Sequence, residues 1–275
     1  MARTNDSLAR KISLGLKTFR GSLTFGRKGT IIWDSYEMWV MEILILPLMQ
    51  MAFFAFLAGY LNYGTSYVQY VVVGNALQVM SFSAVFAVAN ITSQDKWQGT
   101  LPSLIVTPAN RMALLVGRAF FQVLMSTLIA VTGLIYAGLV FGVSFSSANF
   151  VGIAIAIVLT SLAMISFGLL ISAIGLYMRT AMIVANIFLF LTLLVSGVNF
   201  PVSTLPLWLQ PVSYAIPMTY GVEALRMAVS GGSLLSMLLV LVQELVNGLV
   251  VLFIGYLLLI GFERLARSTG RLEEY

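Results

Sequence analysis

Long, continuous apolar stretches limit what this chain can fold into. Six of them reach the roughly 20 residues that an α-helix needs to cross a bilayer, and they lie near 39–60, 67–92, 112–142, 149–176, 181–200 and 234–262. The apolar residues do not alternate with polar ones, so a transmembrane β-barrel is excluded. The sequence therefore predicts an all-α membrane protein with six transmembrane helices.

The lack of charge and of two reactive residue types narrows the function. Charged residues make up 9% of the 275 residues, whereas a soluble domain carries about 25%. Soluble enzymes and nucleic-acid-binding proteins are therefore excluded for the chain as a whole. The chain contains no histidine and no cysteine, which excludes thiolate chemistry, histidine acid–base catalysis and most zinc or haem sites. We expect no metal site and no cofactor in this chain.

The lysine and arginine residues predict the orientation through the positive-inside rule. With the N-terminus inside, the cytoplasmic segments are 1–38, 93–111, 177–180 and 263–275. All 15 basic residues lie in these segments or at their edges, except Arg226. The net charge of +5 then indicates contact with anionic lipid at the inner leaflet. We predict a multi-pass protein of the plasma membrane, in bacteria the inner membrane, with both termini in the cytoplasm.

We predict that residues 1–38 form a cytoplasmic unit, an interfacial helix with an aromatic anchor, before the membrane domain of residues 39–275. Apolar residues recur there at helical spacing among basic residues, which predicts an amphipathic helix lying on the inner leaflet. A disordered basic tail is the alternative. The apolar residues of this face are Leu8, Ile12, Leu16, Phe19 and Leu23.

The segment 201–233 is irregular, with four of the seven prolines of the chain and the pair Gly231–Gly232. Its apolar pieces are too short to cross a bilayer, and proline interrupts them. We predict outer re-entrant half-helices before the last span, because non-helical backbone at membrane depth must be buried in protein or line a cavity. A folded outer loop is the alternative.

Charged residues in the outer half are candidates for function because lipid makes them costly. Glu223 and Arg226 lie three residues apart and share a helix face, and Glu244 lies in the last span. We expect Arg226 to pair with Glu223 or Glu244 and to tie the outer half-helix to the last span. A proton relay is the alternative.

One acidic residue lies close to the inner end of the first span. Glu42 is one turn inside that span. We expect it to be an interfacial acid that pairs with a nearby base such as Arg118 or Lys28.

Two segments carry a resemblance to a known family. The first reads Asp95-Lys96-Trp97-Gln98-Gly99-Thr100-Leu101 and continues to Thr107, Pro108 and Arg111. The second runs from Pro217-Met218-Thr219-Tyr220 to Arg226, with Leu205–Pro206 upstream. Their order and spacing resemble those of the permease subunits of type 2 ABC exporters of drugs and polysaccharides. Trp97 and Pro102 stand where that family has acidic residues.

The resemblance implies a coupling helix within the loop 93–111 that docks on a separate ATPase subunit. The chain has no Gly-x-x-x-x-Gly-Lys-[Ser/Thr] phosphate loop. It is therefore not expected to be an enzyme itself, and ATP and Mg²⁺ would belong to the ATPase partner. The coupling residues implied are Asp95, Lys96, Trp97, Gly99, Thr100 and Leu101.

The resemblance also implies a pair of permeases, a homodimer in preference to two similar chains, with a substrate path at the seam where spans one, two and five meet. For the amides, interhelical hydrogen bonding is the alternative. The path residues would be Gln50, Phe54, Asn75, Gln78, Asn186 and Asn199. The outer half-helices would form a gate with Pro206, Pro217, Tyr220, Glu223, Arg226 and Glu244.

The substrate expected from the resemblance is a hydrophobic or amphipathic compound such as a drug, an antibiotic or a peptide, because the Gly-Thr-Leu loop is more usual in drug-exporting relatives. Export of a polysaccharide or polyol is the alternative, and Phe19-Arg20-Gly21-Ser22-Leu23 with Trp33 partly matches that group. A third reading is an ATP-independent secondary transporter, which would work with this chain alone.

Overall fold

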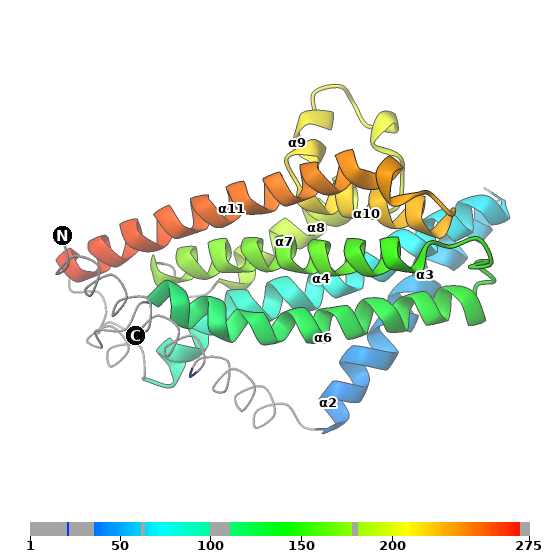
Figure 1. The fold of residues 1–275 in the computed structure, drawn as a ribbon. Helices are drawn as coiled ribbons and strands as arrows, with labels where there is room; N and C mark the ends of the chain where they lie inside the picture. Colours follow the sequence, from blue (N-terminus) through cyan, green and yellow to red (C-terminus); the bar gives the residue numbers. More distant parts are fainter. Residues whose placement is uncertain (1–20, 22–35, 62–63, 100–110, 178–180, 270–275) are drawn as a thin grey trace, which may run out of the picture.

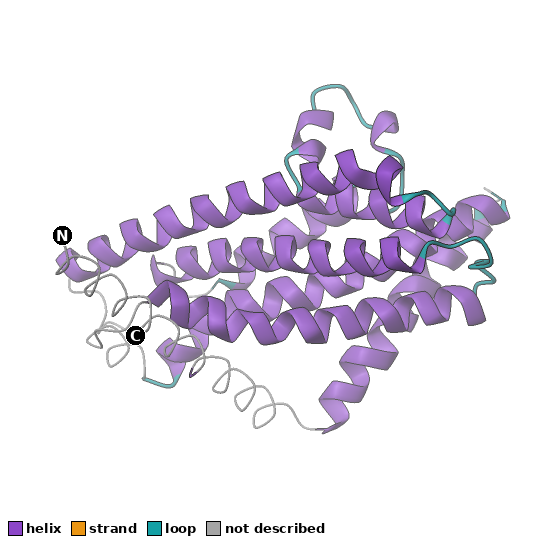
Figure 2. Ribbon diagram, in the orientation of Figure 1, coloured by secondary structure: helices purple, strands orange, loops and turns teal. Residues whose placement is uncertain are grey.

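The computed structural model describes residues 21, 36–61, 64–99, 111–177 and 181–269. Within these ranges the regular structure is helical and no strand occurs (Figure 2). The amphipathic helix predicted within 1–38 lies outside the described residues, apart from Gly21 and the first residues of the helix that starts at Tyr36.

Among the described residues, five helical segments are long and apolar enough to cross a membrane. Four are single helices that run side by side (Figure 1), and the fifth is composite, because a π-helix joins two α-helices. The single helices are α4 (Thr65–Trp97), α6 (Arg111–Leu139), α7 (Phe150–Tyr177) and α11 (Leu234–Thr269). The composite segment consists of α2 (Tyr36–Val40), η1 (Met41–Ile45) and α3 (Leu46–Tyr60). The helices predicted in these five places are confirmed.

The stretch predicted as the fifth span is shorter than expected. It forms the helix α8 (Met182–Val195), which has 14 residues and extends about 21 Å at the α-helical rise of about 1.5 Å per residue. The hydrocarbon core of a bilayer is about 30 Å thick. After Val195 the chain leaves the helix at Ser196 and turns at Gly197, which has a positive φ of 77°.

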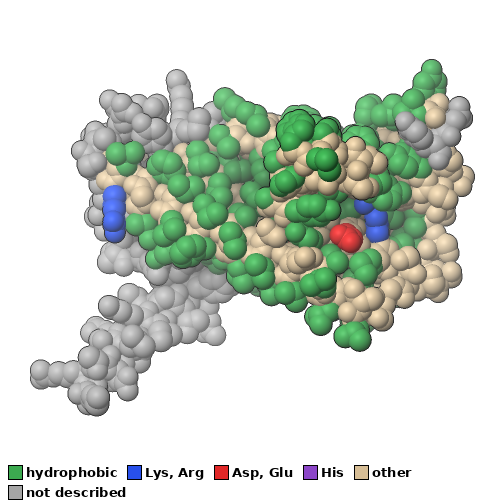
Figure 3. All heavy atoms as spheres, turned by 90° about the horizontal axis from the view of Figure 1, so that it is seen from above, with side chains coloured by type: hydrophobic (Ala, Val, Ile, Leu, Met, Phe, Trp, Pro, Cys, Tyr) green, Lys and Arg blue, Asp and Glu red, His purple; other side chains and the backbone are tan. Residues whose placement is uncertain are grey.

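Helix α4 forms the centre of the bundle, where it packs against α3, α6 and α7. In the most apolar stretch of α4, 78% of the residues are buried. The corresponding share is 17% for the first spanning segment and 22% for α11. The fully buried side chains of α4 include Val72, Leu77 and Met80. On the face seen in Figure 3, hydrophobic side chains are spread over the described part, and charged ones occur at few places. The outer faces of α3 and α11 are thus suited to lipid or to another apolar surface.

Short helices follow α8, as the prolines predict. They are η2 (Val202–Thr204), α9 (Gln210–Tyr214) and α10 (Pro217–Val229). Helix α9 projects from the bundle (Figure 1), whereas α10 packs against α7, α11 and α4. The depth of α9 and α10 in a bilayer stays a prediction.

Candidate functional site

Arg226 on α10 holds the broken end of α8. Its Nη1 donates to the carbonyl of Gly197 at 2.8 Å, and its Nη2 donates to the carbonyls of Val198 at 2.8 Å and Tyr70 at 2.9 Å. The guanidinium also lies over the Tyr70 ring, 3.3 Å from the ring centroid. One side chain therefore joins α10, the start of α4 and the segment after α8.

Two tyrosines of α4 donate to the same segment. The hydroxyl of Tyr70 donates to the carbonyl of Gly197 at 3.0 Å, and that of Tyr67 donates to the carbonyl of Asn199 at 2.7 Å. The last carbonyls of a helix lack intrahelical partners, and in an apolar environment each one left unpaired is costly. The carbonyls of Gly197, Val198 and Asn199, beyond the end of α8, likewise need donors, and Arg226, Tyr67 and Tyr70 supply them. The α8 carbonyls of Leu193 and Val195 accept instead from Asn199 and Ser213.

Gly74 allows α4 to approach this segment closely. A Cβ atom at position 74 would lie 2.5 Å from the carbonyl oxygen of Val198 and 2.6 Å from Nη2 of Arg226. Real Cβ contacts are not that short, so glycine is the residue that fits. Gly74 follows Tyr70 by four residues, which places both on one face of α4.

The predicted pairing of Arg226 with Glu223 or Glu244 is wrong. Within the described ranges neither carboxylate forms an ion pair with Arg226, and Glu223 is exposed. Arg226 faces α4 and the α8 end, where backbone carbonyls take its donors.

Glu244 has other neighbours at the junction of α7, α10 and α11. It is fully buried, and its Oε1 accepts a 2.6 Å hydrogen bond from Thr160 of α7. A Cβ atom on Gly221 of α10 would clash with the Thr160 hydroxyl and lie 2.6 Å from Oε1 of Glu244. Glu244 is therefore in contact with α10, but through Gly221 and Thr160 rather than through Arg226.

The remaining residues predicted for the gate differ in their surroundings. Pro217 begins α10, and it is buried together with Tyr220. The ring of Tyr220 lies 6.2 Å from that of Tyr214 on α9. Pro206 is exposed, in the connection between η2 and α9. Pro217 and Tyr220 are thus packed where α9, α10 and the bundle meet, whereas Pro206 is exposed and its carbonyl accepts from the N–H groups of Leu209 and Gln210 at the start of α9.

Three of the amides predicted for the substrate path form a chain across the bundle. Nε2 of Gln50 donates to Oδ1 of Asn75 at 3.2 Å, and Nδ2 of Asn75 donates to Oδ1 of Asn199 at 2.9 Å. This chain joins α3, α4 and the segment after α8. It lies next to the Arg226 contacts, because Asn75 follows Gly74 and Asn199 follows Val198.

The other three path residues lie apart from this chain. Gln78 is buried and donates to the carbonyl of Leu189 at 3.4 Å, with its Oε1 unpartnered. Asn186 is exposed and donates to the carbonyl of Met182 within its own helix. Phe54 is half-buried against Phe53. The structure thus gathers Gln50, Asn75 and Asn199, but not Gln78, Asn186 and Phe54.

At the opposite end of α4 the predicted coupling loop starts later than expected. Helix α4 continues to Trp97, so Asp95, Lys96 and Trp97 belong to its last turn and not to a new helix. Gly99 then adopts a positive φ of 66°, which is usual where a helix ends. Thr100 and Leu101 lie outside the described residues.

Asp95 links the two ends of this loop. Its Oδ2 accepts a 2.7 Å hydrogen bond from Nη1 of Arg118 on α6, and the two side chains are 6% and 10% exposed. The expected pairing of Glu42 with Arg118 is therefore wrong, and Lys28, the other base named for Glu42, lies outside the described residues. Glu42 instead accepts a hydrogen bond from Ser83 at 2.5 Å.

Tyr67, Tyr70, Gly74 and Arg118 were not identified as site residues from the sequence. The first three recur at positions i, i+3 and i+7 of one helix, which is the spacing of a single face. This stripe of two tyrosines and a glycine is the sequence pattern from which a contact face of that helix could have been predicted. In the described part of the chain no group of three or more acidic residues is placed to hold a metal ion.

Comparison with known proteins agrees with this arrangement. The family model described as "ABC-2 type transporter" matches residues 31–230, a region that runs from the start of the first spanning segment through α10. Two curated proteins are similar, both called "Probable multidrug ABC transporter permease YbhR", from Escherichia coli strain K12 and from Escherichia coli O157:H7. Each is 25% identical over 150 residues, which is 54% of this chain and 40% of the relative. The chain thus covers less than half the length of these relatives. Because the family model matches most of its residues, the chain belongs to the ABC-2 type transporter family.

Proposed function

We propose that this transmembrane ABC transporter subunit exports a hydrophobic or amphipathic compound, such as a drug, an antibiotic or a peptide. Family membership supports the transporter role. The name of the similar YbhR proteins, probable multidrug permeases, supports the substrate class. The largely apolar surfaces and the small number of buried charges agree with a path for apolar molecules.

The proposed topology has six crossings with both termini in the cytoplasm. Five crossings correspond to the five long apolar segments. The sixth consists of α8 together with the irregular segment that Arg226 holds, which adds length beyond the 14 helical residues. The basic residues support this orientation, because all but Arg226 then lie at the inner side or its edge. In bacteria the membrane would be the inner membrane.

The observation that carries the mechanism is the ion pair between Asp95 and Arg118. It joins the end of α4 to the first turns of α6, so the two helices that flank the coupling loop are connected at its base. A push on this loop would therefore act on both helices together. Because α4 is the central helix of the bundle, its movement would reach the outer end, where Tyr67, Tyr70 and Gly74 contact the α8 end and Arg226.

The push would come from a separate ABC ATPase subunit, which ABC-2 permeases normally work with. That partner would bind ATP and Mg²⁺. We further propose that two copies of this chain assemble, with the amides Gln50, Asn75 and Asn199 close to the path and α10 as part of the outer gate. The poorly buried face of α3 supports an apolar partner surface beside the path.

Two glycines with left-handed backbones provide a matched test of coupling. Gly99 (φ +66°) lies at the loop, and Gly64 (φ +85°) lies at the other end of α4. A Cβ atom at either position would meet no atom within 4 Å. Alanine at either site costs a similar backbone strain of about 1 kcal/mol. A strain of 1 kcal/mol corresponds to about a fivefold effect where it bears fully on transport. We therefore expect Gly99→Ala, at the coupling loop, to lower ATP-driven transport severalfold, and Gly64→Ala, away from that loop, to leave it within about twofold.

The assay uses inside-out proteoliposomes that contain the chain with its ATPase subunit and measures ATP-dependent uptake of a lipophilic fluorescent dye. Equal loss or equal retention in the two variants would contradict the coupling role. Uptake of a polysaccharide but not of the dye would contradict the proposed substrate class and favour polysaccharide export. Transport by the chain alone, without ATP, would contradict the ATP-driven mechanism and indicate secondary transport.

A further inference from the structure

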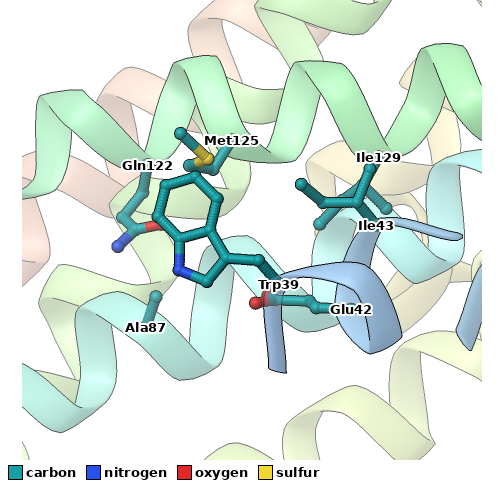
Figure 4. Close-up of a pocket in the computed structure, with 7 residues that line it drawn as sticks. All are labelled: Trp39, Glu42, Ile43, Ala87, Gln122, Met125 and Ile129. Carbon is teal, nitrogen blue, oxygen red and sulfur yellow. The ribbon is translucent and has the colours of Figure 1, made fainter. Parts of the chain in front are cut away.

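A small pocket opens between the first spanning segment, α4 and α6 (Figure 4). Its cavity volume is about 50 Å³. Trp39 and Glu42 enter it from the first segment, and Gln122 and Met125 enter it from α6. None of these residues belongs to the amide chain, to the Arg226 contacts or to the predicted coupling residues.

The irregular backbone of the first segment accounts for the position of Glu42. Glu42 lies in the π-helix η1, and buried Pro47 follows shortly after it. Proline has no N–H to donate to the preceding turn and its ring crowds that turn, which a wider π-turn accommodates. Single π-turns inside α-helices often occur at functional sites. Here the turn presents Glu42 to α4, where Ser83 donates to it, and to the pocket.

The carboxylate of Glu42 has no basic partner among the described residues. The nearest base along α6 is Arg118, one turn before Gln122, and its guanidinium is bound to Asp95 at 2.7 Å. The hydroxyl of Ser83 is the one hydrogen-bond donor that Glu42 has in this part of the chain. A carboxylate inside a membrane protein usually pairs with a cation, so this pocket has acceptor capacity that a cationic ligand would use.

The other pocket residues suit a substituted ammonium group. The indole of tryptophan attracts a cation to its ring face more strongly than any other side chain. The amide oxygen of Gln122 is a further acceptor, and the Met125 thioether is soft and apolar. An anion would be repelled by Glu42, and a divalent metal ion would lack the several oxygen ligands that it requires.

We propose that this pocket binds the ammonium group of an amphipathic amine. The cavity admits a head group of a few atoms, and the hydrocarbon part would lie along exposed apolar side chains next to it on the first segment, such as Met41 and Leu44. The inference rests on the proposed export of amphipathic compounds and defines the charge of the substrate. The same ammonium chemistry is found in a free amine and in the head group of phosphatidylethanolamine.

Binding of radiolabelled octylamine to the full chain, co-expressed with its ATPase subunit, tests the proposal. The complex is placed in nanodiscs of digalactosyldiacylglycerol, which carries no amine, and binding is followed by a scintillation proximity assay. We expect saturable binding that unlabelled octylamine displaces and octanol does not. Glu42→Gln keeps the size of the side chain and an acceptor for Ser83, and we expect it to weaken binding about tenfold or more, as loss of a charged hydrogen-bond partner does.

Two further variants keep the test independent of folding. Glu37→Gln removes an exposed carboxylate from the same segment and should leave binding unchanged. Gln122→Leu keeps the Glu42 charge and should weaken binding less than Glu42→Gln. Equal binding of octylamine to the parent chain and to Glu42→Gln, or equal loss in Glu37→Gln, would overturn the proposal.

A second set of nanodiscs separates the two sources of the ammonium group. If phosphatidylethanolamine raises the octylamine concentration needed for half-saturation, the lipid head group occupies the pocket. If it does not, the ligand is the free amine. Because the assay needs no ATP, a failure of transport would leave binding measurable, and a failure of binding would leave ATP-driven transport to be measured by itself.

Discussion

The close approach of α4 to the α8 end predicts an unusual response to alanine at position 74. In an ordinary helix, replacing glycine by alanine stabilises by about 0.5–1 kcal/mol. At Gly74 the new Cβ would lie 2.5 Å from the Val198 carbonyl oxygen and 2.6 Å from Nη2 of Arg226, so one of them has to move. Overpacking of this kind costs about 1–3 kcal/mol. Displacing the Arg226 hydrogen bonds adds about 1 kcal/mol for each buried carbonyl that loses its donor.

The net expectation for Gly74→Ala is a loss of about 2 kcal/mol in the free energy of unfolding. Gly59 in α3 provides the control, because a Cβ atom there meets nothing within 4 Å. Gly59→Ala should stabilise by the helix-propensity gain of about 0.5–1 kcal/mol. Unfolding by titration with SDS in mixed micelles measures both variants. The reasoning is refuted if Gly74→Ala is as stable as the parent chain or if the two variants shift in the same direction.

Substitutions at three other contacts give further predictions. Arg226→Met removes all three donors to backbone carbonyls and should destabilise more than Arg226→Lys, which keeps the charge but not the planar fork; a difference of about 1–2 kcal/mol in SDS unfolding is expected, and equal stability would count against the cap. Glu244→Gln keeps an oxygen for the Thr160 hydroxyl, so its unfolding free energy should stay within about 1 kcal/mol of the parent, while Glu244→Leu, which lacks that acceptor, should lose about 1–3 kcal/mol. Asp95→Asn leaves Arg118 buried without its carboxylate and should lower the free energy of unfolding by about 3 kcal/mol. The double variant with Arg118→Gln should recover part of this loss. Strict additivity in the double-mutant cycle would show that the pair does not interact.

The sequence predicted the long helices because their signal is local. An apolar run of sufficient length must be helical inside a bilayer, and the runs that became α4, α6, α7 and α11 needed no knowledge of their neighbours. The end of α8 is different. The run stays largely apolar up to Val198, but the helix stops at Val195. Donors from α4 and from Arg226, which follows Val195 by 31 residues, bind the carbonyls of the segment after it. No local pattern contains that information.

The candidate site shows the same division. Asp95 and Gly99 were identified from a motif, and the positive φ of Gly99 agrees with the helix end that glycine favours. The partner of Arg226 was predicted by charge alone, which pointed to Glu223 or Glu244. In the structure, α10 is oriented so that Arg226 faces α4 and the segment after α8. This orientation depends on the packing of α10 against the bundle, which the sequence does not contain locally. The hydrogen bonds of Arg226 go to backbone carbonyls of Tyr70 and of the segment after α8.

If Arg226 lies at the outer gate as proposed, the choice of its acceptors affects the conditions in which that gate would stay closed. Backbone carbonyls do not gain or lose a proton, and their contacts with Arg226 are partly shielded from dissolved ions. An arginine–glutamate pair would weaken in acid as the carboxylate takes up a proton and in high salt through screening. A closure built on Gly197, Val198 and Tyr70 carbonyls avoids both effects. Under the proposed topology, it would hold in the changing medium outside a cell and open only when water or a moving helix replaces the donors.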